Sequence, residues 1–220
     1  MTIKHHLSDA LLMAYSAGTL PEAFNLVIAT HVSLCDECRA RVESFDAVGG
    51  AMLDSCGTAE IGDDALEATM AMIGAARDRG KDPIVTERPA SRAPGVFPAP
   101  LQDYIGGDLD AVHWRPAGGG VKHAILETSK DATVRLIRIP PGAKVPDHGH
   151  RGTEMTLVLK GAFRDDSARF ARGDVEVVNE DVEHTPVAEE GEVCVCLAAT
   201  DAPLRFNALL PKLAQPFLRF

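Results

Sequence analysis

The sequence predicts two domains of different fold class, an all-α domain of four helices followed by an all-β barrel. Three observations support this prediction. Apolar residues recur at helical spacing in the first half, and short β-branched segments parted by Gly, Pro and Asp fill the second. A proline-rich stretch lies between them, which is typical of a linker. The predicted boundaries are a helical domain over 1–85, a linker over 86–98 and a β domain over 99–220.

The composition and the net charge of the chain argue against some classes of function. The chain has 220 residues, 45% of them hydrophobic and 25% charged, as in ordinary globular proteins. Its net charge of −10 argues against direct nucleic-acid binding, which usually requires a basic face. Residues 1–85 carry 6 Lys/Arg against 13 Asp/Glu, a balance that suits a basic protein partner or is simply a solvated surface.

The sequence also predicts a cytoplasmic protein without membrane contact. It has neither an apolar run of the roughly 18 residues that a membrane span requires nor a secretory signal at its start. The cysteines number 5, which is odd, so metal or redox chemistry is expected rather than a disulfide framework.

The four helices are predicted from apolar periodicity and from residues that start and stop helices. In the second helix, for example, Phe24, Val27, Ile28 and His31 form one stripe. The predicted limits of the helices are Ser8 to Gly18, Pro21 to His31, Ser33 to Val48, where Gly49 and Gly50 would weaken or end the helix, and Asp63 to Gly80.

The most specific motif of the helical half is His31-x3-Cys35-x2-Cys38. Two cysteines at a helix start can reach one ion, and the helix N-terminus favours their thiolate forms. His31 adds a third ligand, and the fourth is either His5 or His6, of which we prefer His6 because it adjoins the first helix. The alternatives are a bundle with buried free cysteines, or a thioredoxin-like redox site, which would require a βαβ unit that the sequence lacks.

These residues resemble the zinc-binding anti-sigma family over about residues 1–80. The resemblance implies zinc at this site and a domain that wraps an extracytoplasmic-function (ECF) sigma factor in a 1:1 complex, occluding its surfaces for core RNA polymerase. It also implies that the fourth helix reaches the sigma factor. The apolar side of that helix would be either this interface or intramolecular core, and its residues are Leu66, Met70, Met72 and Ile73.

The β half contains Gly142-x5-His148-x-His150-x3-Glu154-x6-Gly161, with His184 further on. Residues two apart on a strand share a face, so the two histidines and the glutamate are expected to point into one space, with His184 opposite. Such a set suits zinc, iron, manganese, nickel or copper. The alternative is an exposed polar sheet face.

This spacing resembles the first cupin motif, and the likeness covers about residues 100–205. The second motif is looser. Gly173-Asp174 and His184 are present, but Asn179-Glu180-Asp181 stands where the family has Pro-x-Gly. The resemblance implies a conical antiparallel barrel, the double-stranded β-helix, with His148, His150, Glu154 and His184 around a metal.

The domain order resembles the ChrR type of anti-sigma factor. That resemblance implies zinc in both domains, no enzymatic activity, and a cupin that is required to release the sigma factor on an oxidative signal such as singlet oxygen. The alternative is a metal-dependent cupin enzyme, dioxygenase-like, with a small zinc-binding helical appendage.

The remaining cysteines and histidines have weaker patterns. Cys194 and Cys196 share one face of a strand, where they either pack in the core or form an oxidation-sensitive pair. Cys56 is expected in a loop without a role, and His113 and His123 are expected to be structural.

Overall fold

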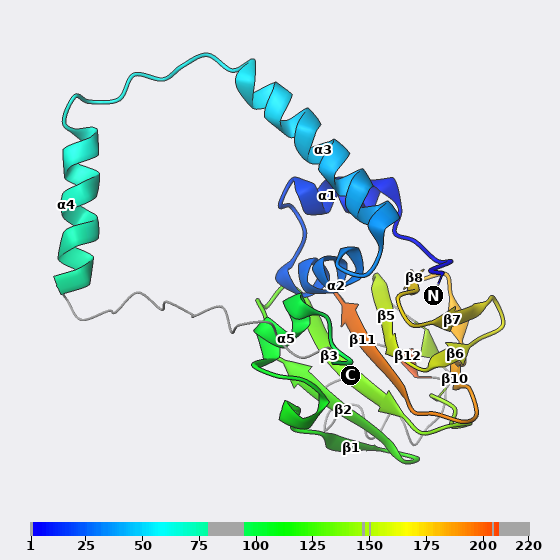
Figure 1. Ribbon diagram of the computed structural model, residues 1–220. Coiled ribbons are helices and arrows are strands. Elements are labelled where there is room, and N and C mark those ends of the chain that lie inside the picture. The colour runs from blue at the N-terminus through cyan, green and yellow to red at the C-terminus, as the bar shows by residue number, and fades with distance from the viewer. Residues whose placement is uncertain (1, 79–94, 147, 150, 204, 207–220) are drawn as a thin grey trace. The chain divides into compact units, whose positions relative to one another are not determined.

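The protein is described by a computed structural model that covers residues 2–78, 95–146, 148–149, 151–203 and 205–206, with backbone only at 76–78, 148 and 205–206. The chain forms two compact units. The first combines Met1–Val48 with Gly95–Phe220, and the second is Gly49–Pro94. Figure 1 shows the elements of each unit. The predicted linker falls largely outside the described residues, so the predicted domain boundaries stay a prediction.

The first two predicted helices are confirmed as α1 (Asp9–Ser16) and α2 (Glu22–Val32). The Ser8 side chain accepts a hydrogen bond from the backbone N–H of Leu11 at 3.4 Å, which makes it the N-cap of α1. Gly18 follows the end of this helix with φ +66°, a conformation that glycine adopts without strain. The two helices share the core residues Leu12, Val27 and Ile28.

The third helix is longer than predicted. Helix α3 spans Asp36–Asp54 and runs through Gly49 and Gly50 without interruption, so a helix end at these glycines is excluded, whereas the predicted weakening stays a prediction. Each glycine costs roughly 1 kcal/mol in a helix interior, which the good helix formers Ala51, Met52 and Leu53 beyond them can offset. Propensity alone was too weak a signal to end this helix.

The fourth helix, α4 (Ala65–Asp78), starts directly after Asp64 as predicted, whereas its predicted stop at Gly80 lies outside the described residues. A further helix, α5 (Ala99–Ile105), was not predicted. The proline-rich sequence was interpreted as a linker, although a proline in the first turn of a helix favours its start. Just ahead of α5, Phe97 is buried at 2% exposure, and its N–H donates to the Asp108 carboxylate.

The second half is antiparallel β-structure, as predicted, and a short 3-10 helix (Leu109–Ala111) precedes it. Its strands form a six-stranded sheet in the order β1-β2-β3-β11-β5-β8 and two three-stranded sheets, β10-β6-β7 and β12-β4-β9. The strands are β1 (Arg115–Gly118), β2 (Val121–Leu126), β3 (Thr133–Ile139), β4 (His148–Gly149), β5 (Glu154–Lys160), β6 (Ala162–Arg164), β7 (Arg169–Ala171), β8 (Val175–Val178), β9 (Glu183–His184), β10 (Val187–Ala188), β11 (Cys194–Thr200) and β12 (Arg205–Phe206).

The two faces of the six-stranded sheet have different roles, because side chains alternate along each strand. One face is apolar and includes Leu136, Leu157 and Leu197. The other carries polar groups, and the strand register aligns Thr156 of β5 with Glu176 of β8 on it. We call these the outer and the inner face of the sheet.

Helix α2 covers the outer face, and it contacts β3, β5 and β11 (Figure 1). Its buried residues Val27 and Ile28 belong to the same hydrophobic cluster as the outer-face leucines. The first helices and the sheet therefore share one core, and at roughly 25 cal/mol per Å² of buried apolar surface this core stabilises both together. Within the described residues, no helix has the length and hydropathy needed to cross a bilayer.

Candidate metal centres

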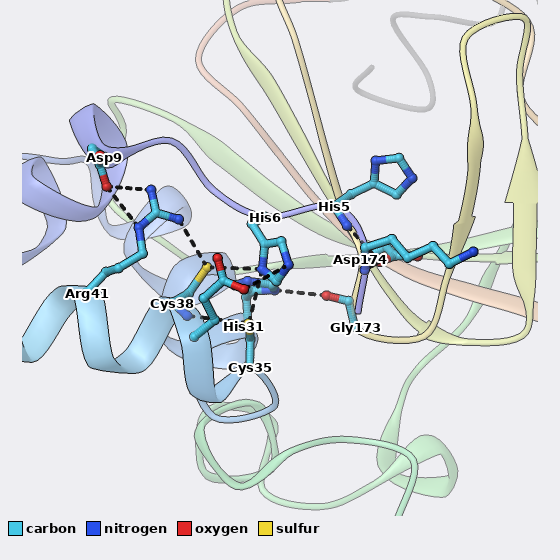
Figure 2. Close-up of polar contacts among 11 residues, drawn as sticks. His5, His6, Asp9, His31, Cys35, Cys38, Arg41, Gly173 and Asp174 are labelled. Atoms are coloured by element: carbon cyan, nitrogen blue, oxygen red, sulfur yellow. Dashed lines mark hydrogen bonds and ion pairs between the residues drawn. The ribbon is translucent and has the colours of Figure 1, made fainter. Parts of the chain in front are cut away.

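The helical half gathers His6, His31, Cys35 and Cys38 into one cluster (Figure 2). His6 comes from the segment before α1, and His31 from the last turn of α2. Cys35 precedes α3, and Cys38 lies in its first turn. The tight connection between α2 and α3 is held by the Cys35 N–H, which donates to the His31 carbonyl at 2.9 Å. The helices and this turn therefore bring the four side chains close together.

The distances suit a tetrahedral zinc ion. One ligand atom from each of the four residues lies within 4.8 Å of the others. The Nδ1 atom of His6 is 3.3 Å from the Cys35 sulfur and 3.6 Å from the Cys38 sulfur. Zinc with ordinary Zn–N and Zn–S bonds requires separations of about 3.3 to 3.8 Å between its ligand atoms.

His31 has an unpartnered nitrogen in the cluster. Its Nδ1 lies 2.9 Å from the carbonyl oxygen of Gly173, and because a carbonyl only accepts, Nδ1 carries the proton and Nε2 a lone pair. The Nε2 atom is buried without a hydrogen-bond partner. Burial lowers the pKa of His31 to about 4, which keeps the ring neutral as a metal ligand requires. A metal would satisfy this nitrogen.

The structure brings His6, and not His5, to the cluster. The Nε2 atom of His6 faces a Glu37 carboxylate oxygen at 3.5 Å, which resembles the carboxylate partner of many metal-bound histidines. His5 instead turns to the β domain, where its ring lies 4.4 Å from that of Phe170 and its Nε2 lies 3.1 Å from the Arg169 carbonyl oxygen.

The two thiols have neighbours that favour negative charge on sulfur. The N–H of Cys38 donates to the Cys35 sulfur at 3.5 Å, and Arg41 lies 4.0 Å from the Cys38 sulfur. Arg41 is itself held by Asp9, to which its Nε donates at 2.9 Å. Burial raises the pKa of Cys38 to about 11, but a bound cation reverses this preference, because a coordinating thiol is deprotonated.

A second cluster lies in the β domain around His184. Its Nδ1 is 3.3 Å from a carboxylate oxygen of Asp165 and 3.3 Å from one of Glu176. All three side chains are at most 5% exposed. Carboxylates that hold Nδ1 orient a histidine for metal binding through Nε2.

The predicted β-domain ligands are described only in part. His150 and the side chain of His148 lie outside the described residues. The backbone nevertheless pairs His148 with His184 across β4 and β9, as the prediction of opposing histidines requires. Glu154 begins β5 on the inner face with 9% exposure, and it accepts a hydrogen bond from Thr156 at 3.0 Å. The four-residue ligand set stays a prediction.

Sequence reasoning missed Asp165 and Glu176. Burial raises the pKa of Glu176 to about 7. Burial acts in the same direction on Asp165, but hydrogen bonds from Glu176, Ala168 and Ser167 hold its pKa below the ordinary value. The available signal for Glu176 was a lone charged residue in the apolar strand Val175–Val178. Asp165 carried no signal, since it lies in a polar turn.

The other cysteines form no further cluster among the described residues. Cys194 and Cys196 are buried on the inner face with their sulfurs 3.6 Å apart, and both are free thiols. The adjacent Cys194 thiol and burial raise the pKa of Cys196, so it is a poor nucleophile. Cys56 is exposed and follows the end of α3.

The predicted interface helix α4 is apolar and exposed. Leu66, Met70, Met72 and Ile73 are between 50% and 73% exposed. By helical periodicity Leu66, Met70 and Ile73 share one face, whereas Met72 lies on another side. Among the side chains described from Gly49 to Ala75, none is buried. These residues therefore form no core within their own unit.

Helices with a His/Cys cluster that suits zinc, packed on an antiparallel β domain with a second buried cluster, define a two-part protein with two candidate metal sites. The family model described as ChrR Cupin-like domain matches residues 102–202. The chain is 57% identical to the anti-sigma-E factor ChrR of Cereibacter sphaeroides over 219 residues, covering 100% of both chains. The chain belongs to the ChrR family of anti-sigma factors.

A solved structure agrees with this assignment. The protein is similar to a chain of the crystal structure of Rhodobacter sphaeroides SigE in complex with the anti-sigma ChrR. The TM-score is 0.77 with 52% sequence identity, and the match covers 91% of this chain and 100% of that chain.

Proposed function

We propose that this protein is an anti-sigma factor that sequesters an ECF sigma factor in a 1:1 complex and keeps it from core RNA polymerase. The observation that carries the proposal is the exposed apolar face of α4, in a chain whose relative is an anti-sigma factor seen with its sigma factor. Apolar residues on one face of an amphipathic helix are a common means of binding a partner protein.

The proposed metal of the helical half is zinc, held by His6, His31, Cys35 and Cys38. Such an ion would supply folding free energy to the helical part, because it would join the N-terminal segment, α2 and α3 at one point. With four protein ligands the site would be closed and structural. It would keep α3 in place, and α3 leads directly into the unit that carries the apolar face.

The proposed role of the β domain is to sense an oxidative signal such as singlet oxygen. A second zinc ion would be held by His148, His150, Glu154 and His184, with Glu176 and Asp165 orienting His184. A change at this site would then release the sigma factor. Membership in a family of anti-sigma factors favours this regulatory role over the cupin-enzyme alternative.

The proposed domain organisation follows from these roles. Residues 1–85 would form the four-helix sigma-binding domain, 86–98 the linker and 99–220 the cupin, a double-stranded β-helix. Because a sigma factor acts in the cytoplasm, we propose the same location for this protein, and the absence of direct contact with nucleic acid or membrane stays a prediction.

Replacing Leu66 and Ile73 of α4 together by glutamate tests the sigma-binding proposal. We expect the double variant to lose at least about 100-fold in affinity for a co-expressed ECF sigma factor, since two buried apolar contacts of about 1.5–3 kcal/mol each would be lost. Affinity is measured by calorimetry on the purified proteins, and their zinc content is determined in parallel.

The matched control is Val177→Glu, which changes an apolar side chain of β8 that is 42% exposed. This variant should bind like the wild type. Wild-type affinity in the α4 double variant would reject α4 as the interface, and absence of a stable complex with any ECF sigma factor would reject the anti-sigma function.

A further inference from the structure

The turn between β7 and β8 contacts His31 and the segment that carries His6 (Figure 2). This turn contains Gly173 and Asp174, and it contacts the N-terminal segment and the last turn of α2. These contacts join residues that are 142 to 170 positions apart in the chain. The β domain therefore forms part of the surroundings of the helical metal cluster.

Asp174 holds the segment that carries His6. Its Oδ1 accepts hydrogen bonds from the backbone N–H of Lys4 at 2.6 Å and of His5 at 3.0 Å. In return, the N–H of Val175 donates to the His5 carbonyl at 3.2 Å. The residue before His6 is thus fixed on both sides of its backbone. Hydrogen bonds to a charged acceptor are among the stronger ones.

Gly173 holds His31. Its carbonyl accepts the Nδ1 proton of the buried imidazole at 2.9 Å, which fixes the ring orientation and directs Nε2 to the cluster. Gly173 has φ +90°, and a Cβ at this position would approach the Ile3 side chain to 2.7 Å. Only glycine permits this conformation together with such close packing of the N-terminal segment.

The same turn leads into the second cluster. Glu176 lies two residues beyond Asp174, on the inner face of β8, and its carboxylate is 3.3 Å from His184. Strand geometry makes the path from Gly173 to Glu176 about 10 Å long. A movement of β8 at Glu176 would therefore also move the groups that hold His31 and His6.

We propose that the Gly173–Asp174 turn positions His31 and His6 for metal binding and is the contact through which the β domain acts on the helical metal site. The inference rests on the proposed zinc site. The turn also offers a route for the proposed regulation. Two sites are energetically coupled when changes at both favour the same arrangement of an element that they share. The turn is such an element, bonded to His31 on one side and continuous with Glu176 on the other.

The test uses the full-length protein loaded with Co²⁺, whose absorption distinguishes the two sites. A thiolate-to-cobalt charge-transfer band arises only from the cysteine-containing cluster, because the proposed β-domain ligands include no sulfur. The measurement is the rate at which a chelator removes cobalt from this cluster. We expect Asp174→Ala to release cobalt roughly 10-fold faster than the wild type, since loss of groups that orient metal ligands typically weakens binding by about 10- to 100-fold.

Asp108→Ala is the matched control. The Asp108 carboxylate also accepts two successive backbone N–H groups, from Val96 at 2.8 Å and Phe97 at 3.0 Å, but it does not contact the helical cluster. It should release cobalt at the wild-type rate even if it destabilises the fold as much as Asp174→Ala does. A second variant, Lys4→Pro, removes one donor to Asp174 without changing the β domain, and it should also release cobalt faster.

A second readout reports His31 directly. In ¹⁵N-histidine-labelled protein, the Nδ1–H signal of His31 should be protected from exchange in the wild type and in Asp108→Ala, and weakened in Asp174→Ala and Lys4→Pro. Wild-type cobalt release and wild-type protection in both of these variants would overturn the inference. Absence of the thiolate band in the wild type would instead reject the proposed metal site itself.

Discussion

Replacing Cys35 and Cys38 together by serine is expected to remove zinc from the helical cluster and to abolish retention of a sigma factor. Both cysteines lie in the group of four ligand atoms within 4.8 Å, and serine is a poor zinc ligand. Structural zinc sites contribute apparent free energies of about 10–16 kcal/mol, so α3 and the segment that carries His6 should lose their fixed arrangement beside α2. The measurements are zinc content of the purified protein and a pull-down from lysate.

Cys56→Ser is the control for this prediction. Cys56 is an exposed free thiol outside the cluster, and its replacement should leave both zinc content and the sigma complex unchanged. Equal retention of the sigma factor by the wild type and the Cys35/Cys38 double variant would show that zinc is not required for the sigma-binding shape.

Replacing Glu154 and His184 together by glutamine is expected to abolish the response to singlet oxygen while leaving basal inhibition intact. Both side chains are buried in the β domain, Glu154 on the inner face of the six-stranded sheet and His184 on β9, and neither belongs to the helical His/Cys cluster. The variant should lack the second metal, and the sigma factor should stay bound when cells are exposed to the signal. A reporter gene under an ECF promoter measures this, with the metal content of the protein determined in parallel.

The control here is Glu180→Gln, an exposed residue in the loop before β9. It should respond like the wild type. A normal response by the Glu154/His184 double variant would remove the sensing role from the β-domain metal site, and constitutive release would show that this site is needed for inhibition itself.

Local sequence patterns predicted the elements and the shorter-range parts of the metal site. His31, Cys35 and Cys38 lie within one bend between two helices, so their spacing alone predicts convergence. Strands β3 (Thr133–Ile139) and β8 (Val175–Val178) are short β-branched segments of the kind that predicted the β half. These features depend on neighbours along the chain.

Features that depend on distant residues could not be predicted. His6 lies in the cluster and His5 does not, because His5 contacts Arg169 and Phe170 of the β domain. The bond from His31 to Gly173 spans 142 positions, and no periodicity marks it. Helix α3 shows that a local signal can also mislead. Gly49 and Gly50 disfavour a helix, but the helix continues through them to Asp54.

The six-stranded sheet is a single layer, so successive residues of one strand face opposite sides. Val175 lies in the core shared with α2, and Glu176 lies beside His184 on the other side. A chimera that joins these helices to the barrel of a distant relative would therefore mismatch the packing between α2 and the outer face of the sheet. This would hold even if the junction lay in the proline-rich stretch. Outer-face substitutions on β3, β5 and β11 should be tolerated only when the facing residues of α2 change with them. The two halves of this protein are thus expected to evolve as one piece.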